Sequence, residues 1–194
     1  MTYKIKLYQA IQKNIVSCNL CKLCNGRNNA VPGRGNLDSK IIFIGEAPGR
    51  NEDNEGLPFV GFAGKILEQA LSKAGIQKND VYITNIVKCR PPNNRIPEND
   101  EISTCTQQYL KKEIQIISPD IVCLLGATAL QSLLNIKGLQ RYHGKTINRD
   151  GIRYFITFHP AATIYKKDLR DTFFNEINSV VNMIKDSNKM SNFQ

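Results

Sequence analysis

The sequence has no long apolar stretch, no internal repeat and no low-complexity block. A membrane-spanning helix needs roughly 20 consecutive apolar residues, and no segment approaches that length. Residues 1–10 mix lysines with apolar side chains and lack the apolar core and cleavage site of a secretory signal. We therefore expect an intracellular, cytoplasmic protein that uses no membrane.

Acidic residues are also fewer than basic ones, and histidine occurs only twice in the 194 residues. The 26 lysines and arginines exceed the 17 acidic residues and give a net charge of +9, which favours polyanions such as nucleic acid. With 41% hydrophobic and 22% charged residues, the composition is that of a globular protein. A chain of this length buries a core without disulfides, which excludes a disulfide-stapled miniprotein and a disordered chain.

Short apolar runs alternate along the chain with segments of helical periodicity. The runs expected as strands are 41–44, 81–87, 121–125 and 153–157, and the expected helices are 4–16, 64–74, 97–118, 127–135 and 168–185. Such alternation predicts an α/β protein, a three-layer α/β/α fold with a central four-stranded parallel sheet. We expect one domain over residues 1–186, followed by a disordered tail over 187–194.

In sheets of this kind, ligands bind beyond the carboxyl ends of the strands. The loops expected at that edge are 45–61, 88–97, the residues around Gly126, and 158–167. Glycines, prolines, acidic residues and one of the two histidines concentrate in these loops. The convergence of unusual residues on one edge predicts an active site there.

The first of these loops begins Gly45-Glu46-Ala47-Pro48-Gly49 and continues to Phe59. It carries three acidic residues within eight positions, and a carboxylate there could activate water or stabilise a developing cation. A solvated acidic turn is the alternative. The loop matches neither the P-loop nor the dinucleotide-binding glycine pattern.

Three polar residues near strand ends each permit a functional and a structural interpretation. His159 follows the last strand and could donate a hydrogen bond to a developing anion, or serve as a structural histidine. Asn85 lies in an apolar strand, where its amide needs a partner; it could read the edge of a base or bridge strand and loop. His143 lies between basic residues, and we assign it to a basic surface loop.

The six cysteines have an informative spacing, because thiols in an intracellular protein stay reduced and serve metal binding or catalysis. Cys18 and Cys21 form a Cys-x-x-Cys pair, and Cys89 and Cys105 are separated by fifteen residues. Four such thiolates could hold zinc or an iron–sulfur cluster, and the spacing leaves both open. Cys123 lies in an apolar strand and is expected in the core.

Taken together, these motifs resemble family 4 of the uracil-DNA glycosylases, the iron–sulfur members of their superfamily, known from archaea and bacteria. The similarity extends from Cys18 to the last helix and rests on the loops at 45–61, 85–92 and 159–161. It implies one [4Fe-4S] cluster, and its ligands would be Cys18, Cys21, Cys89 and Cys105. It also implies two catalytic residues, of which Glu46 would organise water at the flipped base and His159 would face uracil O2.

The resemblance further implies a uracil pocket formed by Gly45, Ala47, Glu52, Phe59, Asn85 and His159. In that pocket Glu52 would reject thymine, Phe59 would stack on the base and Asn85 would pair with its edge. The DNA contacts implied are Lys88, Arg90, Lys145, Pro160, Ala161 and Lys166, with the loop 160–167 entering the DNA stack. The chain departs from many relatives at 142–145, where they carry Arg-Gly-Lys, and Ala47 replaces the aspartate of other uracil glycosylases.

The implied activity is that of a monofunctional glycosylase that flips uracil out of DNA and hydrolyses its N-glycosidic bond, leaving an abasic site for base excision repair. Uracil-containing DNA is the expected partner of a monomer, and no convincing sliding-clamp motif is present. Two other classes stay open at this point. One is an iron–sulfur electron-transfer or redox-sensing protein, and the other is a zinc-stapled nucleic-acid binder without catalysis.

Overall fold

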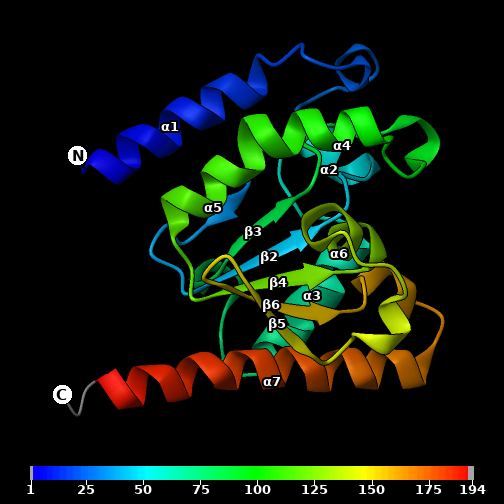
Figure 1. Cartoon of the computed structure of the whole chain (residues 1–194). Helices are drawn as coiled ribbons and strands as arrows, with labels where there is room; N and C mark the ends of the chain where they lie inside the picture. Colours follow the sequence, from blue (N-terminus) through cyan, green and yellow to red (C-terminus); the bar gives the residue numbers. More distant parts are fainter. Residues whose placement is uncertain (1, 192–194) are drawn as a thin grey trace.

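A single mixed sheet forms the centre of the computed structural model, which describes residues 2–191 and their side chains up to residue 185 (Figure 1). The strand order is β1-β3-β2-β4-β6-β5. The strands are β1 (Arg34–Gly35), β2 (Ile41–Gly45), β3 (Tyr82–Asn85), β4 (Ile121–Leu125), β5 (Thr146–Arg149) and β6 (Ile152–Thr157). The four central strands are parallel, as predicted, and β1 and β5 add an antiparallel strand at each edge.

Helices cover both faces of the sheet, which confirms the three-layer architecture (Figure 1). The helices are α1 (Tyr3–Val16), α2 (Arg50–Glu55), α3 (Phe62–Lys73), α4 (Asn99–Cys105), α5 (Lys111–Ile117), α6 (Ala127–Leu134) and α7 (Lys167–Ser191). The core on one face joins the sheet to α1, α5 and α6, and the core on the other joins it to α3 and α7.

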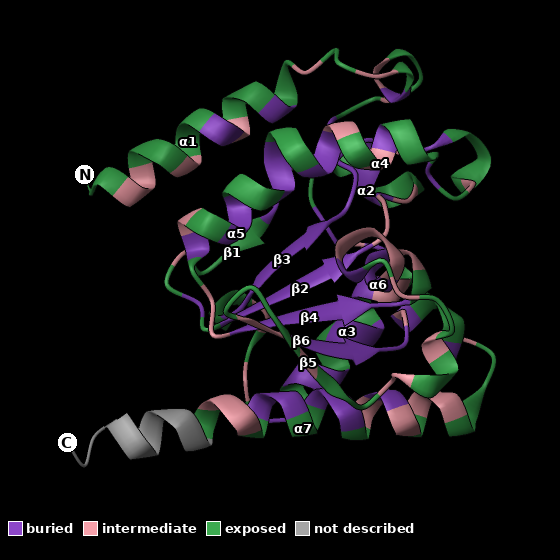
Figure 2. Cartoon of the chain, in the orientation of Figure 1, coloured by how far each residue is buried: buried purple, intermediate pink, exposed green. Residues whose placement is uncertain are grey.

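The central strands are mostly apolar because both of their faces are covered, and polar residues such as Thr84 and Asn85 lie towards the carboxyl end of β3 (Figure 2). Successive side chains of a strand point to opposite faces. In β2, Ile42 and Ile44 belong to the core with α1, α5 and α6, whereas Ile41 and Phe43 belong to the core with α3 and α7. Cys123 of β4 is fully buried in the second core, as expected.

The helix expected over 97–118 is interrupted. A π-helical turn, η4 (Thr106–Leu110), separates α4 from α5. A second difference is α2, which lies within a segment expected to be a loop. Helix α2 lies in the loop after β2, and η4 directly follows Cys105.

The final helix runs to Ser191, beyond the end expected at Lys185. Residues 192–194 of the expected tail lie outside the described residues, so the domain boundary stays a prediction. Within residues 2–191, no helix combines the length and apolar character that crossing a bilayer requires.

Candidate active site

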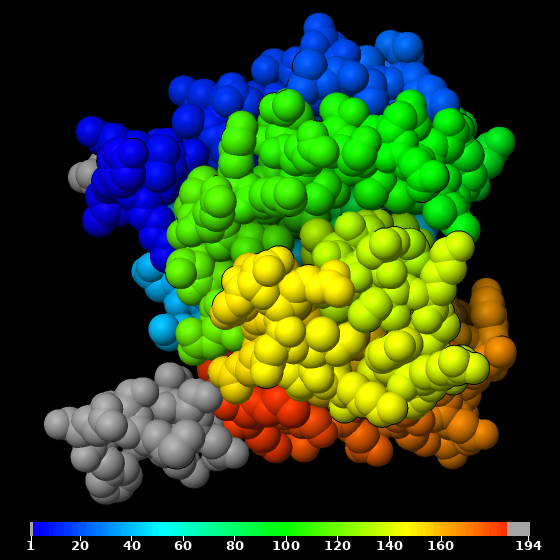
Figure 3. All heavy atoms as spheres, in the orientation of Figure 1, coloured from blue at the N-terminus to red at the C-terminus, as the bar shows by residue number. Residues whose placement is uncertain are grey.

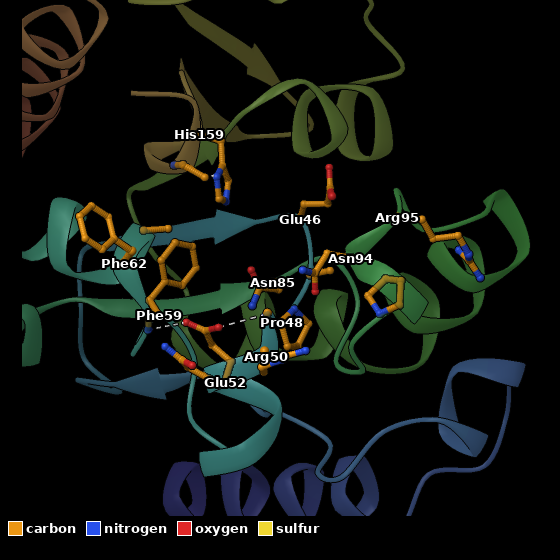
Figure 4. A pocket seen from close by; sticks show the side chains of 17 residues that line it. Glu46, Pro48, Arg50, Glu52, Phe59, Phe62, Asn85, Asn94, Arg95 and His159 are labelled. Carbon is orange, nitrogen blue, oxygen red and sulfur yellow. Dashed lines mark hydrogen bonds between the residues drawn. The ribbon is translucent and has the colours of Figure 1, made fainter. Parts of the chain in front are cut away.

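The loops that follow β2, β3 and β6 meet in one pocket at the carboxyl edge of the sheet (Figure 4). Its volume is about 350 Å³, within the usual range for small-ligand sites. Seven of the residues singled out from the sequence line it: Glu46, Ala47, Glu52, Phe59, Asn85, His159 and Ala161. The predicted convergence of these loops is therefore confirmed.

Asn85 ends β3 and presents a buried amide to this pocket (Figure 4). Its side chain is 2% exposed, and its Oδ1 atom has no hydrogen-bond partner. An unpaired buried polar atom is costly, so such a group in a binding pocket indicates a ligand. Gly45 lies directly beneath, where a Cβ atom would come within 2.5 Å of Asn85 Oδ1 and 2.6 Å of the Phe59 ring. Glycine is therefore needed at position 45 to leave room for both side chains.

Phe59 is held in a strained backbone conformation beside the pocket. Its φ angle is 54°, a left-handed value that aromatic residues rarely adopt. Its carbonyl accepts a hydrogen bond from Lys78 Nζ at 2.5 Å and lies so close to Gly64 that a Cβ there would clash. The ring, 4% exposed, lies 6.0 Å from the His159 ring. Strain of this kind concentrates at functional sites, where it fixes a side chain in place.

His159 enters the pocket from the opposite wall as a neutral imidazole (Figure 4). Its Nδ1 atom accepts a hydrogen bond from the Ala161 backbone N–H at 3.2 Å. Since an N–H group can only donate, the ring proton of the neutral form is on Nε2. Desolvation lowers the pKa of His159 from 6.5 to about 4, and the charge of Glu52 acts in the opposite direction. The site thus offers a neutral N–H donor at pH 7.

Glu46 follows β2 and is oriented by a residue that the sequence did not single out. Thr128, near the start of α6, donates a short hydrogen bond from its hydroxyl to Glu46 Oε2. The loop after β4 was expected at this edge, but no sequence feature distinguished Thr128 from other hydroxyl residues. The contact fixes the carboxylate at the pocket while leaving Oε1 without a protein donor in the described chain.

Glu52 is nearly buried, and its carboxylate joins two helix starts. Oε1 accepts the Gly61 N–H at 2.7 Å, immediately before α3, and Oε2 accepts the Gly49 N–H at 3.1 Å, immediately before α2. This capping explains why residues 50–55 form a helix despite the preceding Pro48-Gly49. Glu52 therefore shapes one wall of the pocket as well as lining it.

Three expectations about the surrounding residues need correction. Lys88 is only 1% exposed and makes a buried ion pair with Glu113, so it cannot reach a phosphate. Pro160 is buried and cannot enter a base stack. His143 is not simply part of a basic surface loop, because its Nδ1 atom lies 2.6 Å from Glu176 Oε1. Burial of this kind depends on distant segments and leaves no trace in the local sequence.

The remaining predicted DNA contacts and one aromatic side chain lie in loops after β3, before β5 and after β6. Lys145 and Lys166 are exposed, and Ala161 is exposed on the pocket rim. Arg90 is half-buried, with its Nε donating to Asn94 Oδ1 at 2.8 Å. Tyr165 is 95% exposed in the loop after β6, and no sequence feature distinguishes it from the other aromatic residues.

A second, smaller cavity brings together Cys18, Cys21, Cys89 and Cys105. Ile15, Leu23, Val87, Lys88, Thr104 and Tyr109 complete the lining, and Cys24 is not part of it. Two N–H donors point at the sulfurs: Arg27 Nη1 lies 2.9 Å from Cys89 Sγ, and the Lys88 backbone N–H lies 3.3 Å from Cys105 Sγ. Such donors stabilise thiolates, so the donor set fits a four-cysteine centre. In the described part of the chain, no three His, Cys, Asp or Glu side chains are arranged to hold a single metal ion.

Comparison with known proteins agrees with this geometry. The profile of the uracil DNA glycosylase superfamily matches residues 32–182. The chain belongs to the uracil-DNA glycosylase superfamily. The matched region extends from the segment before β1 into α7 and includes every pocket-lining residue named above.

The chain is also similar to individual members of the superfamily. The chain is 44% identical to a type-4 uracil-DNA glycosylase of Sulfurisphaera tokodaii, over 84% of this chain and 78% of that protein. It is 40% identical to a type-4 uracil-DNA glycosylase of Thermotoga maritima, over 93% of this chain and 96% of that protein. A type-5 uracil-DNA glycosylase of Pyrobaculum aerophilum is 32% identical over 68% of this chain and 65% of that protein.

Proposed function

We propose that this chain is a uracil-DNA glycosylase that hydrolyses the N-glycosidic bond of uracil in DNA and leaves an abasic site for base excision repair. The observation that carries the proposal is the unpartnered, buried amide of Asn85 in a pocket shared with the Phe59 ring and the neutral His159. Type-4 uracil-DNA glycosylases of similar length support it. We assign the reaction to a monomer in the cytoplasm of a prokaryote, as the family resemblance implies.

Base recognition follows from the groups at the bottom of the pocket. A glycosylase must flip its nucleotide out of the stack, because the bond to be cut is inaccessible there. Phe59 would then stack on the base, and Asn85 Oδ1 would accept the N3–H of uracil while the amide nitrogen donates to O4. Cytosine carries an amino group in place of O4, so a fixed amide disfavours it. Glu52, which lines the same wall, would crowd a thymine methyl group.

Bond cleavage requires stabilisation of two opposite charges. As the glycosidic bond stretches, the base becomes anionic and the sugar becomes cationic. The Nε2–H of His159 would donate to uracil O2, and removing such a donor costs about 3 kcal/mol of transition-state stabilisation in comparable sites. Glu46, held by Thr128, would stabilise the sugar cation or position the attacking water on its far side.

DNA binding would use the exposed residues around the pocket. Lys145, Lys166 and Arg90 would neutralise phosphates, and Ala161 would contact the strand at the rim. In the loop 160–167, Tyr165 is the side chain free to enter the space that the flipped base leaves.

The cysteine-lined cavity would hold one [4Fe-4S] cluster through Cys18, Cys21, Cys89 and Cys105. When bound, such a cluster ties segments together and can accept or give one electron. The cysteines come from the segment after α1, the segment after β3 and the end of α4, so their ligation would join three parts of the chain. Iron and sulfide analysis of anaerobically purified protein tests this assignment, and stoichiometric zinc in place of iron would refute it.

The function is tested with a labelled oligonucleotide that carries one uracil, followed by alkali treatment. We expect strand scission at the uracil and none in matched oligonucleotides with thymine or cytosine. Glu46→Ala and His159→Ala should be much slower while keeping the fold and the cluster. Intact wild-type protein that releases no uracil would contradict the proposal and favour an electron-transfer or binding role.

A further inference from the structure

Lys88 and Glu113 form an ion pair in the interior that the proposed reaction does not use. Each side chain is about 1% exposed, and Lys88 Nζ lies 2.5 Å from Glu113 Oε2. Burying two charges costs more than their attraction returns unless further hydrogen bonds complete the site. The pair is therefore weak evidence for a contribution to the free energy of unfolding, and its hydrogen bonds indicate a different role.

The ammonium group of Lys88 is fully engaged at the end of β3. Besides Glu113, it donates to Thr84 Oγ1 at 2.6 Å and to the backbone carbonyl of Asn85 at 2.8 Å. An ammonium group has three donors, and all three are used here. The lysine thus binds the peptide unit that carries the recognition amide.

The carboxylate of Glu113 anchors this lysine to the rest of the fold. Its Oε1 atom accepts the Gly33 N–H at 2.9 Å and the Tyr82 hydroxyl at 3.1 Å. Its Oε2 atom accepts the Thr84 hydroxyl at 3.0 Å in addition to Lys88. Because Glu113 lies on α5, the network connects that helix, the segment before β1 and the end of β3.

The Asn85 amide depends on its backbone for orientation. Among the described residues, no hydrogen bond reaches its side chain, and its Oδ1 atom is unpaired. Steric contact with Gly45 and Phe59 limits its position, but no polar partner fixes its direction. Its peptide unit is held by two hydrogen bonds, one from Lys88 Nζ to the Asn85 carbonyl at 2.8 Å and one from the Ile86 N–H to the Gly45 carbonyl at 2.9 Å, and Lys88 supplies the only one of these two that comes from a side chain.

We propose that the buried Lys88–Glu113 pair is a positioning device that holds the Asn85 peptide unit and so aligns its amide with the edge of uracil. This inference rests on the proposed function. The pair also joins the two cavities, because the Lys88 backbone N–H donates to Cys105 Sγ at 3.3 Å and Cys89 is the next residue. Lys88 is a positioning residue that touches neither DNA nor the base.

The test replaces the pair by apolar residues of similar size, Lys88→Met with Glu113→Leu, so that no charge is left unpaired. The melting temperature should be equal to or higher than that of the wild type. Uracil release should slow by about tenfold to a hundredfold, the order expected when a reacting group is misplaced by about 1 Å. Inhibition by free uracil should weaken in parallel, while the Kd for an undamaged oligonucleotide stays unchanged.

Two further variants keep the test decisive. Thr84→Val retains the ion pair but removes the hydroxyl that both partners contact, and it should cause a smaller loss in the same two measurements. Lys4→Gln with Asp38→Asn removes an exposed pair of the same two charges and should change neither. The proposal is overturned if the apolar pair keeps wild-type release and uracil inhibition, or if it weakens binding to undamaged DNA.

The outcome also separates this inference from the proposed function. If the wild type releases no uracil, the proposed function fails. Calorimetry with free uracil then still compares the wild type with the apolar pair. Equal binding to both, or no binding to either, would remove the positioning role as well.

Discussion

At the scale of single residues, the state of His159 is set by one backbone hydrogen bond and by desolvation. The Ala161 N–H occupies Nδ1, and the lowered pKa, about 4, keeps the ring neutral. We expect the rate of uracil release to show no inflection near pH 6.5 from this residue and to decline only as the pH approaches 4. NMR titration of the two histidine rings checks this, with His159→Gln used for assignment.

The same shift has a consequence for stability. A histidine whose folded-state pKa lies below its unfolded value binds fewer protons when folded. The free energy of unfolding should therefore decrease as the pH falls from 6.5 towards 4, and this part of the decrease should vanish in His159→Gln. Urea denaturation at several pH values measures it. An equal pH dependence in the variant would show that other groups are responsible.

Tyr165 gives a second prediction at this scale. A side chain that fills the space of a flipped base matters only where a stack must be preserved. Tyr165→Ala should reduce uracil release from duplex DNA by about tenfold, since unstacking costs a few kcal/mol, and should affect single-stranded substrate much less. Tyr165→Phe is the control. Equal losses on both substrates would remove this role.

Individual residues also show how far the sequence predicts a site. Asn85 and His159 line one pocket because strand ends of a parallel sheet share one edge, and their contact with uracil stays a prediction. Lys88 was assigned wrongly to the DNA surface. It is buried against Glu113, which lies 25 residues further along the chain on α5, so the local sequence does not reveal the pair. Thr128 could not be predicted, because only the fold brings its hydroxyl to Glu46.

At the scale of elements, the Glu52 carboxylate stabilises the starts of α2 and α3 beside the pocket by accepting a backbone N–H from each. Glu52→Ala leaves the Gly49 and Gly61 N–H groups without an acceptor, which costs about 1–3 kcal/mol for a buried donor. We expect a decrease of this order in the free energy of unfolding, measured by urea denaturation, together with loss of uracil binding. Glu52→Gln should lose less, because its amide oxygen can still accept one N–H.

The central strands were predictable, and the two missed strands share a cause. The central strands consist largely of buried apolar residues, so their apolar runs identified them in the sequence. The edge strand β1 has two residues, and β5 is largely exposed, forming the yellow segment on the surface in Figure 3. Neither carries the apolar pattern of a buried strand, because each pairs only along one side.

At the scale of the whole molecule, the net charge of +9 should govern affinity for DNA. Binding to phosphates releases counterions, so log K should fall linearly with log salt concentration. Lys145→Ala and Lys166→Ala should each reduce the slope by about 1, because both side chains are exposed in the loops before β5 and after β6 that we assign to DNA contact. Fluorescence anisotropy with an undamaged oligonucleotide measures the slopes. Lys112→Ala, an exposed lysine on α5, serves as the comparison, and equal slopes for all three would contradict the assignment.

The π-helical turn η4 has a consequence for the spacing of the chain. It lies between Cys105, which faces the cysteine-lined cavity, and Glu113, which pairs with Lys88. A π turn holds one residue more than an α-helical turn, and each residue rotates a helix by about 100°. Deleting a single residue from 106–110 would turn one of these side chains away from its partner. Cys105 and Glu113 therefore both face their partners because the π turn adds one residue between them.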